Sequence, residues 1–138
     1  MPADTTADAH DGTYELTVTR EFIAQHYLTV PDPEPPEGDI HSHRFTIEVE
    51  FAADSLGEYG YLVDITEVEA LLDDVEGRYR DTLLNDLPEF EGLNPSVEHF
   101  ARIVCDRFCE ELSDDSPDEV TVRVREDDLA WASYRRAT

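Results

Sequence analysis

Three histidines have the types and spacing of a metal site. His41 and His43 flank a single serine, and His26 precedes them across a proline-rich stretch. Imidazole nitrogens are common zinc ligands, and three of them with an open fourth position form the usual catalytic zinc site. A His-x-His pair is also found simply as polar residues at the end of a strand. The metal-site hypothesis therefore depends on where His26 lies relative to the pair.

The segments that carry these histidines alternate between apolar and polar residues, which is typical of strands. Residues of equal parity share one face of a strand. His41 and His43 have the parity of the apolar residues at 45–51, and His26 has that of the apolar residues at 16–24. If the two strands pair across the loop 31–38, all three rings meet at one end of the sheet. We therefore predict one Zn²⁺ bound by His26, His41 and His43.

Two carboxylates are candidates for further roles. Glu126 ends an apolar alternation that begins at Val120, so it either has a partner or ligand or lies at a solvated strand end. A carboxylate that accepts two N–H donors also suits the amino-oxo edge of a pterin ring. Glu37 lies just before His41 and could act as a base in a dry pocket, or could be one more acid in a mobile loop.

The histidines require a sheet to position them, and the rest of the chain supplies one. Strands are expected at 14–22, 45–51, 120–126 and 129–134. Asp64 and Ser96 have the character of helix N-caps, for helices that extend to Tyr79 and Leu112. The order β-β-α-α-β-β predicts an α+β fold, with two helices on one face of a four-stranded antiparallel sheet. We expect a disordered tail at 1–12 and a single domain at 13–138.

Composition narrows the possible partners. The chain has 34 acidic residues against 10 basic ones, all of them Arg, for a net charge of −24. Such a surface repels nucleic-acid phosphates and anionic membranes, so neither is expected as a partner. Because molar salt screens self-repulsion of this size, we interpret the acidity as halophilic adaptation.

The polar N-terminus and the absence of a long apolar run predict a cytoplasmic protein. The spacing of Cys105 and Cys109 favours two buried hydrophobes of a helix.

Six sequence blocks, taken together, resemble the family of 6-pyruvoyltetrahydropterin synthase and 6-carboxytetrahydropterin synthase. The resemblance spans about residues 14–136, with every block in order. The blocks are Gln25-His26, Glu37-x-x-x-His41-Ser42-His43, Gly60-x-x-Val63-Asp64-Ile65, Leu83-Leu84-Asn85, Asn94-Pro95-Ser96-x-Glu98 and Val124-Arg125-Glu126.

The resemblance implies a fold, a ligand set and a substrate. Family members have the tunnelling fold, in which four-stranded sheets of several subunits close into barrels, usually as a hexamer of two trimers. The implied substrate is 7,8-dihydroneopterin triphosphate, bound between subunits. By resemblance the three histidines hold zinc, Glu126 anchors the pterin ring, and Ser96 and Glu98 contribute to substrate binding.

The sequence departs from the family where protons are moved. The family's catalytic Cys stands four residues before the first His of its His-Gly-His motif; here that position is Glu37. The Asp-His pair expected before Leu-x-Asn reads Asp81-Thr82. Some branches use a Glu three residues before the His, where this chain has Gly38. Glu37 and Asp81 are the candidate catalytic residues, and His99 either replaces the missing His or is an exposed helix residue.

Two functions remain open on this pattern. The first is a zinc-dependent lyase acting on 7,8-dihydroneopterin or its triphosphate, in pterin, folate or 7-deazaguanine biosynthesis. The second is a non-catalytic pterin- or purine-binding member that has lost the Cys and His. In either case we expect a homo-oligomer, a trimer or hexamer.

Overall fold

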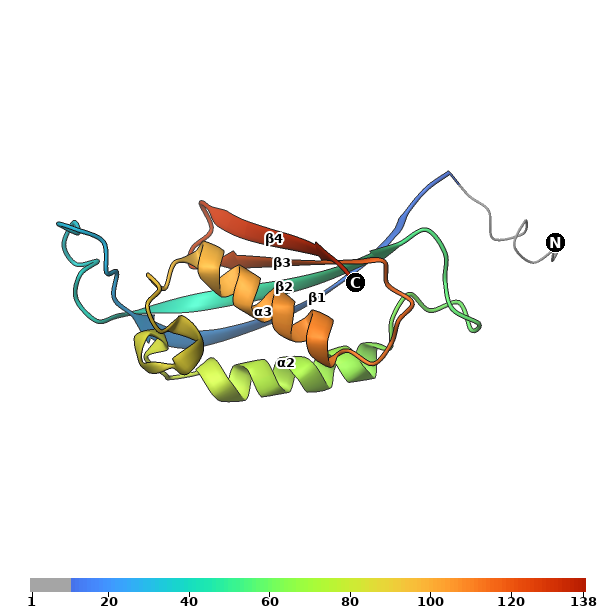
Figure 1. The fold of residues 1–138 in the computed structure, drawn as a ribbon, viewed down its shortest axis with the longest axis horizontal. Helices are drawn as coiled ribbons and strands as arrows, with labels where there is room; N and C mark the ends of the chain where they lie inside the picture. Colours follow the sequence, from blue (N-terminus) through green and yellow to red (C-terminus); the bar gives the residue numbers. More distant parts are fainter. Residues whose placement is uncertain (1–10) are drawn as a thin grey trace.

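The computed structural model describes residues 11–138. It contains one antiparallel sheet of four strands, β1 (Tyr14–His26), β2 (His41–Ala53), β3 (Glu119–Arg125) and β4 (Trp131–Ala137), in the order β1-β2-β3-β4. Two helices, α2 (Ile65–Tyr79) and α3 (Val97–Glu111), lie together on one face of this sheet (Figure 1). The predicted α+β architecture and the predicted element order are confirmed. The tail prediction falls almost wholly on residues 1–10, outside the described part of the chain.

The core lies between the sheet and the helices because each element presents one apolar face. Along β2, every second residue from Phe45 to Ala53 is buried, while its neighbours are partly exposed. Helix α2 begins where the Asp64 carboxylate accepts the Thr66 N–H (2.9 Å), and α3 where the Ser96 hydroxyl accepts the His99 N–H (3.1 Å). The largest fully buried side chains are Tyr79, Phe45, Phe51, Phe90, Phe100, Phe108, Ile47, Leu72 and Leu84.

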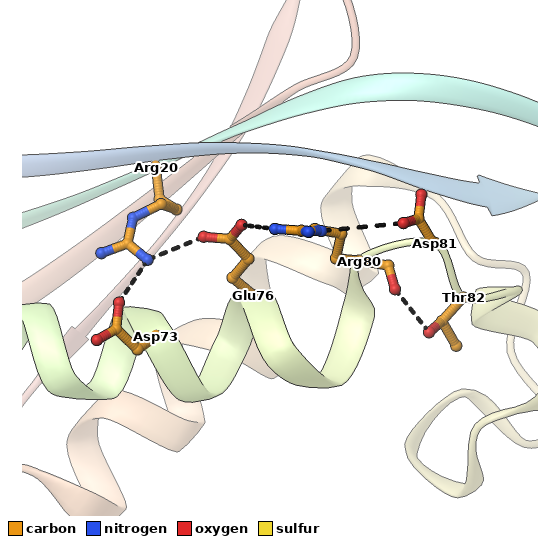
Figure 2. A network of polar contacts seen from close by, with 6 residues as sticks. All are labelled: Arg20, Asp73, Glu76, Arg80, Asp81 and Thr82. Carbon is orange, nitrogen blue, oxygen red and sulfur yellow. Dashed lines mark hydrogen bonds and ion pairs between the residues drawn. The ribbon is translucent and has the colours of Figure 1, made fainter.

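A charged residue on the helix-facing side of β1 is neutralised by α2. Arg20 has the parity of the apolar residues of β1, yet its guanidinium reaches the carboxylates of Asp73 (2.8 Å) and Glu76 (3.0 Å). Glu76 also accepts from Arg80 (2.8 Å), so two cations share one carboxylate (Figure 2). Acidic partners thus make an arginine acceptable in the layer between sheet and helix.

The strand boundaries differ from the prediction at the C-terminal hairpin. We predicted strands at 120–126 and 129–134, whereas β3 ends at Arg125 and β4 begins at Trp131. The Asp127 carboxylate accepts the N–H groups of both Leu129 (2.8 Å) and Ala130 (3.2 Å), which holds this stretch as a turn. Because the N–H groups of Leu129 and Ala130 bond to Asp127, they do not pair with the neighbouring strand. The connection between β3 and β4 is therefore longer than the alternation of apolar and polar residues predicted.

The connection from α2 to α3 contains two short 3₁₀ helices, η1 (Leu84–Asp86) and η2 (Pro88–Phe90). Glu89 of η2 pairs with both ends of the Arg78 fork (2.5 and 2.6 Å) and accepts the Tyr79 hydroxyl (2.8 Å). Chiefly through the Arg78 hydrogen bonds, the pKa of Glu89 is lowered to about 2. This carboxylate therefore fastens the connection to the end of α2.

Glu89→Gln should make folding stability less dependent on pH. A lowered folded-state pKa stabilises the protein above the unfolded pKa, near 4.5, and this contribution disappears as pH falls from there to about 2. We expect the variant to be less stable by about 1–3 kcal/mol at neutral pH, with the difference closing between pH 4.5 and 2. Urea unfolding at constant salt measures it. Glu91→Gln, an exposed acid of the same connection, is the control; equal stability of both variants at neutral pH would contradict the assignment.

No helix within residues 11–138 combines the length and apolar character that crossing a membrane requires.

Candidate metal and substrate site

The three histidines of the sequence prediction lie together at the end of the β1–β2 hairpin. His26 is paired with His41 across the two strands, and Ala24 with His43, so all three rings share the helix-facing side. The ring centroids are 4.6 Å (His26–His41), 5.1 Å (His26–His43) and 4.9 Å (His41–His43) apart. One nitrogen from each ring can be chosen so that all three lie within 4.8 Å of one another. The three histidines could hold a metal ion.

Hydrogen bonds fix which nitrogen of two of these rings is available. The Nδ1 of His26 lies 2.9 Å from the carbonyl oxygen of Pro95, and the Nδ1 of His41 lies 2.7 Å from that of Asp39. A carbonyl can only accept, so each Nδ1 carries a proton and each neutral ring presents a lone pair at Nε2. Backbone carbonyls hold metal-ligating histidines in this way in many metal sites. His26 is 2 % exposed, and its burial lowers its pKa, which favours the neutral, ligating form.

The segment that precedes α3 holds the end of β1 in place. The Asn85 amide accepts the Tyr27 N–H and donates to the Tyr27 carbonyl, both at 3.0 Å, and the Asn94 amide oxygen accepts the Thr29 N–H (2.9 Å). With the Pro95 carbonyl on His26, contacts from this segment reach three residues at the end of β1 and just beyond it. Both asparagines belong to the family blocks of the sequence, but the sequence did not predict that they hold β1. A single asparagine leaves no periodic pattern in a sequence, and a backbone carbonyl such as that of Pro95 can belong to any residue type.

Glu126 lies beside the histidines, just beyond the last residue of β3. Its Oε2 is 3.7 Å from the Nε2 of His26 and 3.7 Å from the Nε2 of His43. With Glu98 and Trp131 it lines a cavity of about 180 Å³, so Glu126 links this cavity to the rings of His26 and His43. The Ser96 hydroxyl is less available for substrate binding, because it already accepts the His99 N–H at the start of α3. The structure therefore brings the candidate substrate-binding carboxylates Glu98 and Glu126 to one cavity.

The two candidate catalytic carboxylates are not in contact with the histidines. Asp81 is at the outer edge of β1, where its N–H donates to the Ile23 carbonyl (2.7 Å) and its exposed carboxylate pairs with Arg80 (3.9 Å; Figure 2). Glu37 is exposed on the loop between β1 and β2, with its carbonyl accepting the Leu28 N–H (2.8 Å). Within the described residues, no hydrogen bond or ion pair joins either carboxylate to the three rings.

The remaining candidate, His99, is half-buried in the first turn of α3. Its Nδ1 donates to the Asn94 carbonyl (2.8 Å), so its neutral ring also presents Nε2 as an acceptor. It is not a member of the three-histidine group.

Comparison with known proteins places this arrangement in a family. The sequence model described as 6-pyruvoyl tetrahydropterin synthase matches residues 15–137. The chain belongs to this family. The 6-carboxy-5,6,7,8-tetrahydropterin synthase of Bacillus subtilis is 29% identical over 135 residues, which cover 91% of this chain and 88% of the relative. The predicted family resemblance is therefore confirmed.

Solved structures with the family's name share the fold at low sequence identity. The 6-pyruvoyl tetrahydropterin synthase of Caenorhabditis elegans has a TM-score of 0.75 at 15% identity, with 91% of this chain and 97% of that chain covered. A Plasmodium vivax 6-pyruvoyltetrahydropterin synthase gives a TM-score of 0.74 at 14% identity, with 93% and 100% covered; in that structure a catalytic residue, a glutamate, is replaced by cysteine. These likenesses place the four strands and two helices of this chain in the fold of the 6-pyruvoyl tetrahydropterin synthase family.

Proposed function

We propose that the protein is a zinc-dependent lyase that acts on 7,8-dihydroneopterin or its triphosphate. One observation carries the proposal: in a chain of this family, three imidazoles converge beside a carboxylate that lines an adjoining cavity. Three imidazoles with a fourth position left for another ligand suit Zn²⁺. Zinc, when bound there, would supply Lewis-acid polarisation of a substrate side-chain oxygen.

The chain's own residues have separate parts in this proposal. Glu126 and Glu98 accept N–H donors of the pterin ring from the wall of the cavity, and Ser96 keeps the start of α3 in place beside them. Glu37 takes the side-chain proton, and Asp81 assists that transfer. Support for Glu37 comes from the Plasmodium vivax protein, in which a glutamate is a catalytic residue.

The direct test is to incubate the protein with 7,8-dihydroneopterin triphosphate and Zn²⁺ in molar salt and to identify products by mass spectrometry. We expect a 6-substituted tetrahydropterin or a cleaved side chain in the wild type and none in His43→Ala. Binding of the pterin with no product in the wild type would instead support the non-catalytic alternative. That alternative is favoured by one observation, the exposure of both candidate catalytic carboxylates in a single chain.

We further propose that copies of the chain assemble through the sheet edges. In the order β1-β2-β3-β4, strands β1 and β4 are the edge strands, and exposed edges favour pairing with another chain. Residues 81–85 bond to the β1 edge from Ile23 onward, so the part of β1 that would pair is 14–22. Arg135 of β4 and Glu15 and Glu21 of β1 lie on the face opposite the helices. Opposite charges at the two edges would favour head-to-tail contacts that close a barrel.

Assembly should depend steeply on salt. The chain carries a net charge of −24, and the Debye length falls from about 10 Å at 0.1 M salt to about 3 Å at 1 M. We expect trimers or hexamers in molar KCl and dissociation when KCl is lowered to 0.1 M. Light scattering coupled to size-exclusion chromatography measures the mass. A monomer at molar salt would contradict the proposed assembly.

A further inference from the structure

The Glu126 carboxylate lies close to the ring nitrogens of His26 and His43 with no cation between them. The Nε2 of His26 presents a lone pair, because its Nδ1–H is donated to Pro95. The Glu126 Oε2 faces this lone pair at 3.7 Å and lies at the same distance from the Nε2 of His43. Two acceptors repel each other unless a proton or a metal ion lies between them. A metal ion between the three groups would remove this repulsion, because each of them could donate a lone pair to it.

Two distances from the Glu126 carboxylate are close to those of a tetrahedral ligand set, while the carboxylate lies outside the group formed by the three histidines. Zinc–nitrogen and zinc–oxygen bonds of about 2.0–2.1 Å place the ligand atoms of a tetrahedron about 3.3–3.4 Å apart. The Glu126 oxygen is only slightly farther than this from two of the three imidazole nitrogens. Its side chain is 35% exposed and lies one residue beyond the last paired residue of β3. This partly exposed side chain would have to turn further toward the three rings to take the fourth position.

We propose that Glu126 is the fourth metal ligand of the substrate-free protein and that it leaves the metal when the pterin binds. The inference rests on the proposed metal site and deepens the proposed role of Glu126. In the free protein the carboxylate offsets one of the two positive charges and closes the site to other anions. When substrate enters the cavity, hydrogen bonds to ring N–H donors would replace the contact of Glu126 with the metal, and the fourth position would become open to the substrate. One carboxylate would thus couple ring recognition to opening of the metal site.

The test is metal affinity in the absence of any pterin, which separates ligation from substrate binding. Zn²⁺ affinity is measured by competition with a chromogenic chelator, and the ligand field by the visible spectrum of the Co²⁺-loaded protein. We expect Glu126→Gln to weaken Zn²⁺ binding at least about tenfold and to change the Co²⁺ spectrum. In the wild type, saturating 7,8-dihydroneopterin should change the Co²⁺ spectrum as the carboxylate departs.

Asp127→Asn is the matched control. It removes the same charge one residue along, and its amide oxygen can still accept from Leu129 and Ala130 as the carboxylate does. We expect its Zn²⁺ affinity to stay within about twofold of wild type, because an exposed charge that is not a ligand contributes little.

Equal Zn²⁺ affinities of Glu126→Gln and Asp127→Asn would overturn the assignment of Glu126 as a ligand. The proposed function would survive that result if the wild type binds one metal and His43→Ala does not. A wild type that binds neither Zn²⁺ nor Co²⁺ would instead overturn the metal site itself, and this inference with it.

Discussion

His43→Ala is expected to lower bound zinc from one per chain to near zero while leaving the protein folded. The imidazole of His43 faces the other two rings and Glu126, so its removal takes away a proposed ligand. Both rings lie against Phe45, but the side chain of His43 is 28% exposed, whereas that of His26 is 3% exposed. A substitution at His26 would therefore confuse loss of metal with loss of core packing, and His43 is the cleaner choice.

The loss of turnover should follow the loss of zinc. Lewis-acid polarisation by a metal is worth several kcal/mol of transition-state stabilisation, which corresponds to about 10³-fold in rate or more. Elemental analysis after dialysis measures the metal, and circular dichroism checks the fold. His99→Ala serves as the control for zinc content, because His99 is outside the three-histidine group and donates its Nδ1–H to Asn94. Equal zinc in the wild type and in His43→Ala would refute the ligand assignment.

The part of the site carried by strands could be predicted because strand parity is a local property. His41 and His43 needed only the alternation of the residues after them, and His26 that of the residues before it. The proline-rich stretch between the two strands predicted a loop, so the two strands were expected to pair with each other. The observed pairing of His26 with His41 agrees with that expectation. The two-residue period of the strands thus predicted that the three rings lie on one face of the sheet, without any information about the helices.

The part of the site carried by irregular backbone could not be predicted in the same way. Residues 81–85 run along the outer edge of β1, where the Gln25 N–H donates to the Thr82 carbonyl (3.0 Å) and the Asn85 amide replaces a strand partner for Tyr27. No alternation marks this segment, because its hydrogen bonds to β1 are made by backbone groups and one side-chain amide. Likewise, the closeness of Glu126 to His26 depends on the register of β3 against β2, which pairs Thr46 with Arg125. Both are long-range properties of the folded chain.

The loop between β1 and β2 limits where a base can stand. A side chain at Gly38 would bring its Cβ to 2.6 Å from the Cγ of Pro33, so the position three residues before His41 is sterically closed to a glutamate. Glu37, one residue earlier, has its backbone fixed on both sides: its N–H donates to Glu34 and its carbonyl accepts from Leu28, both at 2.8 Å. The Leu28 bond places the Glu37 backbone opposite Leu28, two residues after His26, and within residues 11–138 its carboxylate has no hydrogen bond or ion pair.

Glu37→Gln is expected to lower turnover by about 10²–10⁴-fold, the usual contribution of a positioned general base. The amide keeps the size and hydrogen bonding of the side chain but cannot take the substrate's side-chain proton. Zinc content and pterin affinity should be unchanged, because the loss is confined to the transition state. Glu34→Gln, an exposed acid in the same loop, is the matched control and should stay within about twofold of wild type. Wild-type turnover in Glu37→Gln would show that this carboxylate is a bystander and that the proton is taken by another group.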